Sequence, residues 1–271
     1  MSIDVSGTTV LVTGASSGLG AEFARRFADR GADLVLVARR ADRLEQLADE
    51  LRGDYGVTVT VLPADLASAG AAARLRGELT ARGIRVGSLI NNAGFGTFGD
   101  FASADLDRLD SEIQLNVNAL VELSHVFMPD LLAGHGGALV NIASTTAFQP
   151  IPGMAVYAAT KAFVLSFSEA LWAEARGTGL TVLAVCPGPT RTEFFDVVGS
   201  YAAAVVPMQT APEVVATTFR ALDRRNTPPS VISGLVNRVV AVSIRTTTRR
   251  IGALIPAHLL GNVRMHASVD R

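Results

Sequence analysis

Short apolar runs rich in Val, Ile and Leu alternate with amphipathic helical patterns from residue 8 to about residue 235. The apolar runs predict buried strands, because both faces of a strand in a parallel sheet are covered. We expect strands at residues 8–12, 34–37, 57–62, 88–90, 138–142 and 180–185, with a candidate seventh strand at 230–232. We expect helices at residues 19–29, 41–52, 105–132, 155–177 and 212–222.

This alternation has a direct consequence for the fold. Parallel strands need crossover connections, and these are usually helices. The pattern therefore predicts an α/β fold with a Rossmann-type, doubly wound parallel sheet of about seven strands and helices on both faces. We expect one domain over residues 1–237, followed by a basic tail, 238–271, that is expected to be helical. The tail holds six arginines and one acid, Asp270, among apolar residues.

Composition and charge exclude several classes of protein. The chain has 271 residues, of which 49% are hydrophobic, so it can bury a substantial core. Its 24 Lys and Arg against 25 Asp and Glu argue against a nucleic-acid partner, which needs clustered cations. A single cysteine, Cys186, fits a reducing compartment, and neither a secretory signal nor a clean membrane span is recognisable. We expect a cytoplasmic protein.

A glycine-rich loop, TGASSGLG at residues 13–20, joins the first strand to the first helix. Glycines at such a turn let the backbone approach a pyrophosphate, whose charge the helix N-terminus stabilises. The spacing is GxxxGxG rather than the usual GxGxxG. A tight strand–helix turn without a ligand is the alternative interpretation.

The same loop also matches GxSxG, the nucleophile elbow of α/β-hydrolases, with Ser16 as the nucleophile. His135-Gly136-Gly137 could then be taken for an oxyanion loop. In that fold the oxyanion loop precedes the nucleophile, whereas here it follows about 120 residues later. The order therefore argues against a hydrolase.

The second predicted strand ends in Ala38-Arg39-Arg40. An acid at this place would bind a ribose 2′-hydroxyl and select NAD, but no acid is present. An arginine can instead bind a 2′-phosphate. NADP(H) is therefore expected rather than NAD(H), the alternative being two solvated arginines at a helix start.

Tyr157 and Lys161 are four residues apart at the start of a predicted helix, so their side chains share one face. A free tyrosine titrates near about 10, too high for acid–base work at neutral pH, and a nearby ammonium would lower that pKa. An isolated surface pair is the alternative. Other polar residues, however, fall at the predicted carboxyl ends of strands, where open α/β sheets bind ligands.

On these residues the sequence resembles the short-chain dehydrogenase/reductase family. The resemblance covers roughly residues 6–235 and rests on the glycine loop 13–20, Asp65, Asn91-Asn92-Ala93-Gly94, Asn116, Ser144, Tyr157, Lys161 and Cys186-Pro187-Gly188. The strings around Arg39 and Asn92 are similar to an NADP-preferring subgroup.

The resemblance implies an NADP(H)-dependent carbonyl reductase or alcohol dehydrogenase. Tyr157 would be the general acid or base, Ser144 would bind the substrate oxygen, Lys161 would bind the nicotinamide ribose, and Asn116 would hold a relay water. The implied cofactor site comprises Gly14, Ser16, Ser17, Gly18, Leu19, Gly20, Arg39, Arg40, Asp65, Leu66, Asn92, Ala93, Gly94, Tyr157, Lys161, Pro187, Gly188, Thr190 and Thr192.

Residues 190–209 would form a flap over the substrate, in which Phe194 and Phe195 join Ser144 and Tyr157 as substrate contacts. Its apolar residues, which include Tyr201, Val205 and Val206, suggest an apolar carbonyl or alcohol substrate. An ordinary buried helix is the alternative. No pair of histidines has metal-ligand spacing, so no metal site is expected.

By analogy with the family, a homodimer or homotetramer is expected, built on the helices at 105–132 and 155–177. The basic tail could lie on an anionic membrane surface or dock on protein, and we prefer the second interpretation. A non-catalytic dinucleotide sensor on the same fold is the alternative function, and epimerase or dehydratase chemistry ranks below it. The intact Asn116, Ser144, Tyr157 and Lys161 set argues for the enzyme.

Overall fold

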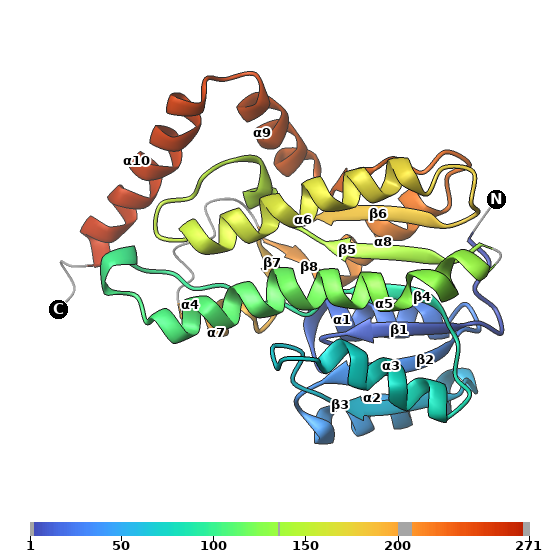
Figure 1. The fold of residues 1–271 in the computed structure, drawn as a ribbon. Coiled ribbons are helices and arrows are strands. Elements are labelled where there is room, and N and C mark those ends of the chain that lie inside the picture. Colours follow the sequence, from blue (N-terminus) through green and yellow to red (C-terminus); the bar gives the residue numbers. More distant parts are fainter. Residues whose placement is uncertain (1–2, 135, 200–207, 268–271) are drawn as a thin grey trace.

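Seven parallel strands form the central sheet of the computed structural model, which describes residues 3–134, 136–199 and 208–267 (Figure 1). The strand order is β3-β2-β1-β4-β5-β6-β9, and neighbouring strands are parallel throughout. The strands are β1 (Thr9–Thr13), β2 (Asp33–Ala38), β3 (Val59–Pro63), β4 (Val86–Asn91), β5 (Ala138–Ile142), β6 (Thr181–Cys186) and β9 (Ser230–Ile232). The predicted doubly wound sheet is confirmed.

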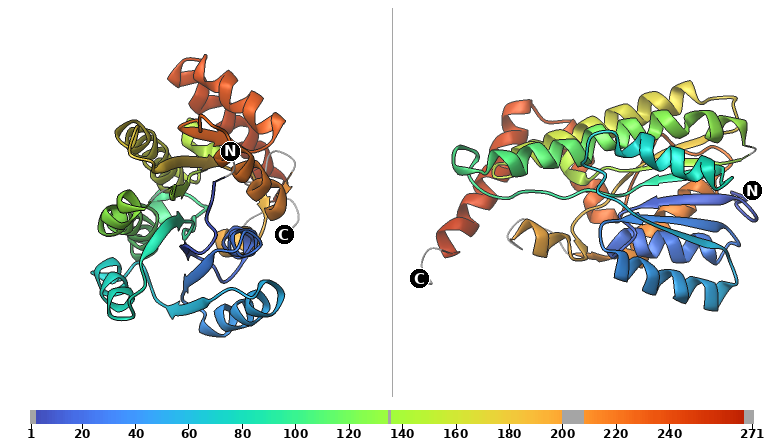
Figure 2. Two further views of the ribbon diagram at one scale, coloured as in Figure 1. Left: turned by 90° about the vertical axis from the view of Figure 1, so that its right-hand side faces the viewer. Right: turned by 60° about the horizontal axis from the view of Figure 1, so that its bottom comes forward.

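Helices cover both faces of this sheet (Figure 2). One face carries α1 (Gly18–Ala28), α2 (Ala41–Tyr55) and α8 (Ala211–Leu222), and the other carries α3 (Ala71–Ala81), α5 (Leu120–Ala133) and α6 (Ala155–Glu174). Along β1, Val10 and Val12 pack with the first group, while Leu11 packs with the second. A strand with apolar residues on both sides is buried on both sides, which explains its unbroken apolar run.

Two helical regions differ from the sequence prediction. The predicted helix at 105–132 is divided into α4 (Leu106–Ile113), a π-helical turn (Gln114–Ala119) and α5. Helix α3 was not predicted, because it buries only four residues and two of them, Ala71 and Ala72, are alanines. Alanine contributes little to an apolar pattern, although it has a high helix propensity.

The carboxyl ends of the strands carry most of the remaining elements. A short parallel pair, β7 (Thr190–Arg191) and β8 (Gln209–Thr210), and the helix α7 (Phe194–Val198) lie there. The tail forms α9 (Leu235–Arg245) and α10 (Arg249–Ala267), which project from this end of the sheet as the two arms of a V (Figure 1). Within the three described ranges, no helix is both long enough and apolar enough to span a membrane.

Gly137→Ala tests the close approach of β4 and β5 just before β5 begins. A Cβ at this residue would lie 2.0 Å from the carbonyl oxygen of Gly87, so Gly137→Ala must push β4 and β5 apart. We expect a loss of about 1–3 kcal/mol in the free energy of unfolding, measured by urea denaturation. Gly77→Ala is the control, because nothing lies within 4 Å of its added Cβ on α3. It should stabilise by about 0.5–1 kcal/mol, and equal effects of the two substitutions would contradict the expected clash.

Candidate active site

A cavity of about 1080 Å³ opens at the carboxyl ends of β1, β4, β5 and β6. Drug-sized ligands occupy pockets of about 300–1,000 Å³, so this cavity has room for a ligand larger than one small substrate. It lies where the strand order reverses between β1 and β4, the position at which doubly wound sheets bind ligands. All residues predicted for the cofactor and substrate line it, except Gly20.

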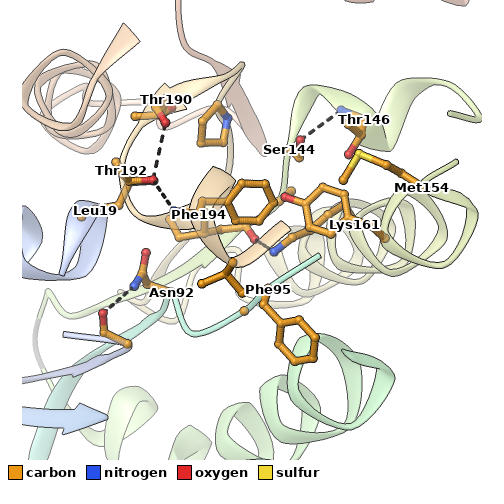
Figure 3. A pocket seen from close by; sticks show the side chains of 18 of the residues that line it. Leu19, Asn92, Phe95, Ser144, Thr146, Met154, Lys161, Thr190, Thr192 and Phe194 are labelled. Atoms are coloured by element: carbon orange, nitrogen blue, oxygen red, sulfur yellow. Dashed lines mark hydrogen bonds between the residues drawn. The ribbon is translucent and has the colours of Figure 1, made fainter. Parts of the chain in front are cut away.

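The glycine loop forms one wall of the cavity and is tied to the end of β4. The Asn92 side-chain amide donates to the carbonyl oxygens of Thr13, at 2.9 Å, and Gly14, at 3.3 Å (Figure 3). The Thr13 hydroxyl oxygen accepts from the backbone N–H groups of Asn92 and Ala93 at 2.9 and 3.0 Å. A Cβ on Gly20 would lie 2.2 Å from the Gly14 carbonyl oxygen, so the absence of a side chain at Gly20 lets α1 pack directly against the glycine loop.

The start of α1 is suited to an anion. Its N-cap residue, Ser17, makes no side-chain capping bond, which leaves first-turn N–H groups for an external acceptor. Above them, the half-buried Arg40 donates to the hydroxyl oxygens of Ser16, at 3.0 and 3.2 Å, and of Ser17, at 2.9 Å. Arg39 also lines the cavity but is exposed. This donor set fits the phosphates of a dinucleotide cofactor.

Arg40 also binds an acid that the sequence interpretation missed. Its guanidinium lies 2.8 Å from the Glu193 carboxylate, and Arg43 binds the other oxygen of the same carboxylate. These two arginines lower the pKa of Glu193 and keep it ionised. No local sequence signal pairs Glu193 with residues 150 positions away.

The predicted catalytic residues come together at the other end of the cavity. Ser144 follows β5, and Tyr157 and Lys161 lie on the first turns of α6; all three side chains are buried and line the cavity. The Lys161 ammonium donates to the carbonyl oxygen of Ile142 at 2.8 Å (Figure 3). The phenol and the hydroxyl thus adjoin the interior space in which a carbonyl group could bind.

Burial sets the ionisation of this pair. It raises the pKa of Tyr157, and the hydrogen bond with Ser144 lowers it less. Burial also lowers the pKa of Lys161 to about 8. The lowered tyrosine pKa expected beside an ammonium is therefore not found for the protein chain alone. The ammonium lies 5.7 Å from the Tyr157 ring centre, and its own charge is destabilised by desolvation.

Asn116 lies behind the cavity rather than in its lining. It belongs to the π-helical turn, and its side-chain amide donates to the Phe95 carbonyl oxygen at 2.8 Å and to the Thr160 hydroxyl at 3.1 Å. Its amide oxygen accepts from the Phe95 N–H at 3.1 Å. A Cβ on Gly94 would lie 2.8 Å from that oxygen and 3.4 Å from the Lys161 nitrogen. Asn116 therefore positions the 94–95 segment beside Lys161, and its relay water stays a prediction.

A second missed acid, Glu112, lies one helical turn before Asn116. It is fully buried, and neither carboxylate oxygen has a hydrogen-bond partner of normal geometry within the described ranges. Burial raises its pKa, while its own charge raises the pKa values of Tyr157 and Lys161. Its spacing of three residues from the buried Leu109 places both on one face of α4, and this spacing is the sequence signal that could have indicated its burial.

Apolar side chains close the substrate end. The Phe194 ring (Figure 3) lies 5.3 Å from the Tyr157 ring, and the buried Phe195 ring lies 5.4 Å from that of Phe194. Tyr201, Val205 and Val206 lie outside the described residues. The tail, which sequence interpretation treated separately, contributes Val239, Val240, Ile244, Ile255 and Pro256 to the lining.

The other candidate chemistry has less structural support. The Ser16 hydroxyl faces the Arg40 guanidinium, which cannot act as a base, so the hydrolase alternative lacks its proton acceptor. Cys186 is fully buried, and burial raises its pKa to about 12. Among the side chains that the structure describes, no group of His, Cys, Asp and Glu could hold a metal ion. His135 and the side chain of His266 lie outside that set.

Comparison with known proteins gives the family. The model of the short chain dehydrogenase family matches residues 8–201. Sulfoacetaldehyde reductase 2 from Chromohalobacter salexigens is 41% identical over 188 residues, which cover 68% of this chain and 73% of that protein.

Solved structures agree with that match. A short-chain dehydrogenase from Sphingobium yanoikuyae in complex with NADPH is 39% identical, with a TM-score of 0.76, over 87% of this chain and 92% of that chain. A structure of 7β-hydroxysteroid dehydrogenase is 28% identical, with a TM-score of 0.83, over 95% of this chain and all of that one. The matched sequence and the shared fold confirm the resemblance: this chain belongs to the short-chain dehydrogenase/reductase family and is an oxidoreductase.

Proposed function

We propose that this enzyme uses NADP(H) to interconvert an apolar carbonyl compound and its secondary alcohol. One observation carries the proposal: a single cavity joins an anion-binding end, made by Ser16, Ser17 and Arg40, to a buried end with Ser144, Tyr157 and Lys161. The first end fits the phosphates of the cofactor, and the second fits a reacting carbonyl. The structure of the Sphingobium relative with NADPH supports the cofactor.

Each residue has a defined task in this proposal. The bound cofactor supplies or accepts the hydride. Tyr157 donates a proton to the carbonyl oxygen during reduction and accepts it during oxidation, while Ser144 hydrogen-bonds that oxygen. Lys161 binds ribose hydroxyls of the cofactor. Asn92, Gly94, Pro187, Gly188, Thr190 and Thr192 line the nicotinamide half, and Arg39, Asp65 and Leu66 line the adenosine half.

Several surfaces suggest that the substrate is apolar. Phe194 and Met154 adjoin the reaction end, and α9 and α10 extend the lining with Val239, Val240 and Ile255. Burial of apolar substrate area against these residues contributes about 25 cal/mol per Å². The similarity to a hydroxysteroid dehydrogenase supports an apolar substrate. The similarity to a sulfoacetaldehyde reductase does not support it, because sulfoacetaldehyde is a small anion.

We also propose a cytoplasmic homodimer or homotetramer. The lone cysteine, which has no partner for an internal disulfide, supports a reducing compartment. The exposed Phe163 on α6, stacked on Phe167 at 5.8 Å, supports a subunit contact along that helix. Docking of α9 and α10 on protein remains our preference over contact with a membrane.

Tyr157→Phe tests the proton donor and separates an enzyme from a dinucleotide sensor. We expect a loss of about 10²–10⁴ in kcat for reduction of a ketone panel, because the phenolic proton is removed. NADPH affinity, measured by cofactor fluorescence, should stay within about threefold of wild type, since the ring is retained. Tyr55→Phe, on a half-exposed residue of α2, is the control. Retained turnover in Tyr157→Phe would rule out this role, and failure of the wild type to bind NADPH would rule out the proposed function.

A series of methyl ketones of increasing chain length tests the substrate class. Each additional buried methylene contributes about 0.8 kcal/mol, so kcat/KM should rise about fourfold per methylene until the cavity is filled. Steady-state rates with NADPH give the slope. A flat or falling series, or a preference for short anionic aldehydes, would contradict an apolar site.

The ionisation of Lys161 predicts a pH-dependent stability. Because burial lowers the pKa of Lys161 to about 8 from its ordinary value of 10.5, the unfolded chain holds more protons than the folded chain between these two pH values. The stability of the wild type should therefore rise relative to Lys161→Met across that interval, by up to about 1.4 kcal/mol per pH unit, and level off on both sides. Thermal unfolding of both proteins at several pH values, followed by Trp172 fluorescence, gives the difference. A constant difference would mean that Lys161 keeps its ordinary pKa.

A further inference from the structure

Glu193 connects two parts of the molecule that the proposed reaction uses separately. Its carboxylate lies 2.8 Å from Arg40 and also binds Arg43, at the anion-binding end of the cavity. Its backbone lies between β7 and α7, directly before Phe194, whose ring packs on Tyr157. One residue therefore bridges the adenosine end and the reaction end.

The partners of Glu193 are the donors that a phosphate monoester would use. Arg40 donates to the Ser16 and Ser17 hydroxyls as well as to the carboxylate, and Arg43 adds a second guanidinium. Guanidinium groups bind phosphate and carboxylate by the same charge-assisted hydrogen bonds. Glu193 thus holds the arginines in the way that an external anion would.

We propose that Glu193 is an internal competitor for the 2′-phosphate of NADP(H), and that the phosphate releases α7 when it displaces Glu193 from Arg40 and Arg43. This inference rests on the proposed use of Arg40 for NADP(H). A carboxylate and a phosphate at the same guanidinium groups repel each other, so both cannot be bound there at full strength. The cofactor with the stronger anion takes the arginines, and the flap loses one of its attachments.

Helix α7 is also attached at the reaction end, where Phe195 and Val198 are buried and Val198 packs with Met154 and Tyr157. Arg108 donates to the Val197 carbonyl oxygen at 2.7 Å, and Phe194 contacts the Tyr157 ring. Both lie at the reaction end, where a substrate would also bind. Loss of the Glu193 pairs therefore removes the attachment of α7 to the anion-binding end and leaves its contacts at the reaction end. Because coupling between sites is reciprocal, substrate that moves α7 away from Arg40 should also strengthen binding of the 2′-phosphate.

Binding constants for Glu193→Gln test the competition. The amide keeps the size of the side chain but removes its charge, so NADPH should bind about three- to tenfold more tightly, as expected for the loss of two half-exposed ion pairs. NADH, which lacks the 2′-phosphate, should change by less than about twofold. Glu45→Gln is the matched control, because Glu45 lies on the same helix as Arg43 and pairs with Arg52. It should leave both constants unchanged.

Amide hydrogen exchange tests the release of α7 without any reaction. The probes are 2′,5′-ADP and 5′-AMP at saturation, because both leave the nicotinamide half free and differ only in the 2′-phosphate. In the wild type, 2′,5′-ADP should speed exchange in residues 193–199, where the Val197 and Gly199 amides are bonded within the helix. 5′-AMP should not do so, and Glu193→Gln should exchange at the faster rate with either probe.

The outcomes separate this inference from the proposed cofactor. If the wild type binds NADPH no better than NADH, the phosphate assignment fails and the competition fails with it. If the wild type prefers NADPH but Glu193→Gln binds it equally or more weakly, only the competition is overturned, and Glu193 instead closes over the phosphate. Unchanged exchange in 193–199 with 2′,5′-ADP would overturn the release of α7.

Discussion

The bonds between the ends of β1 and β4 are the constraint on which the site depends. The Thr13 hydroxyl and the Asn92 amide bind each other's backbone, and the absence of a side chain at Gly20 lets α1 start directly against the Gly14 carbonyl. These contacts hold the glycine loop open at the point where the sheet reverses its direction of winding. A shift of this corner would move the floor of the cavity and the start of α1 together, because both are built on the same few atoms.

The reaction end of the cavity buries ionisable groups that would be more stable in water. Tyr157, Lys161 and Glu112 are all buried, the charge of Glu112 acts on the other two, and desolvation is the largest influence on each pKa. Burial of such groups reduces stability, and the surrounding sheet and helices compensate for it. In return, the electrostatic interactions of the buried phenol and amine are weakly screened by solvent, and a bound cofactor would add its own charge.

The anion-binding end has a different character. Arg40, Arg43 and Glu193 are all about 40% exposed, so their pairs are weak and easily exchanged. Exchangeable pairs suit a site that must bind and release a large cofactor. The two ends are joined by residues 190–199, which begin beside the glycine loop and end against α4, so a change at one end has a short route to the other.

The seven strands of the central sheet and most of the helices between them followed from the sequence, because short apolar runs rich in β-branched residues are typical of buried strands. Helix α3 did not follow from it. The glycine loop, Ser144, Tyr157 and Lys161 were also recognisable, since each follows a predicted strand or begins a helix. The structure decided what depends on residues far apart in the chain. Local pattern did not show that Asn116 lies on a π-helical turn, that Glu112 is buried, or that α9 and α10 line the cavity.

Glu193 is one residue at which the local sequence and the tertiary structure give different information. Its type and its neighbours indicate a polar residue in a loop, and nothing nearby indicates a partner. Its pairing with Arg40 and Arg43 arises only because β7 follows β6, whose carboxyl end lies at the same edge of the sheet as that of β2. The sequence by itself determined the strands of the sheet, most of the helices and the chemical groups that are present. The tertiary structure decided which of those groups meet, because burial and long-range contact depend on how the elements pack rather than on their local pattern.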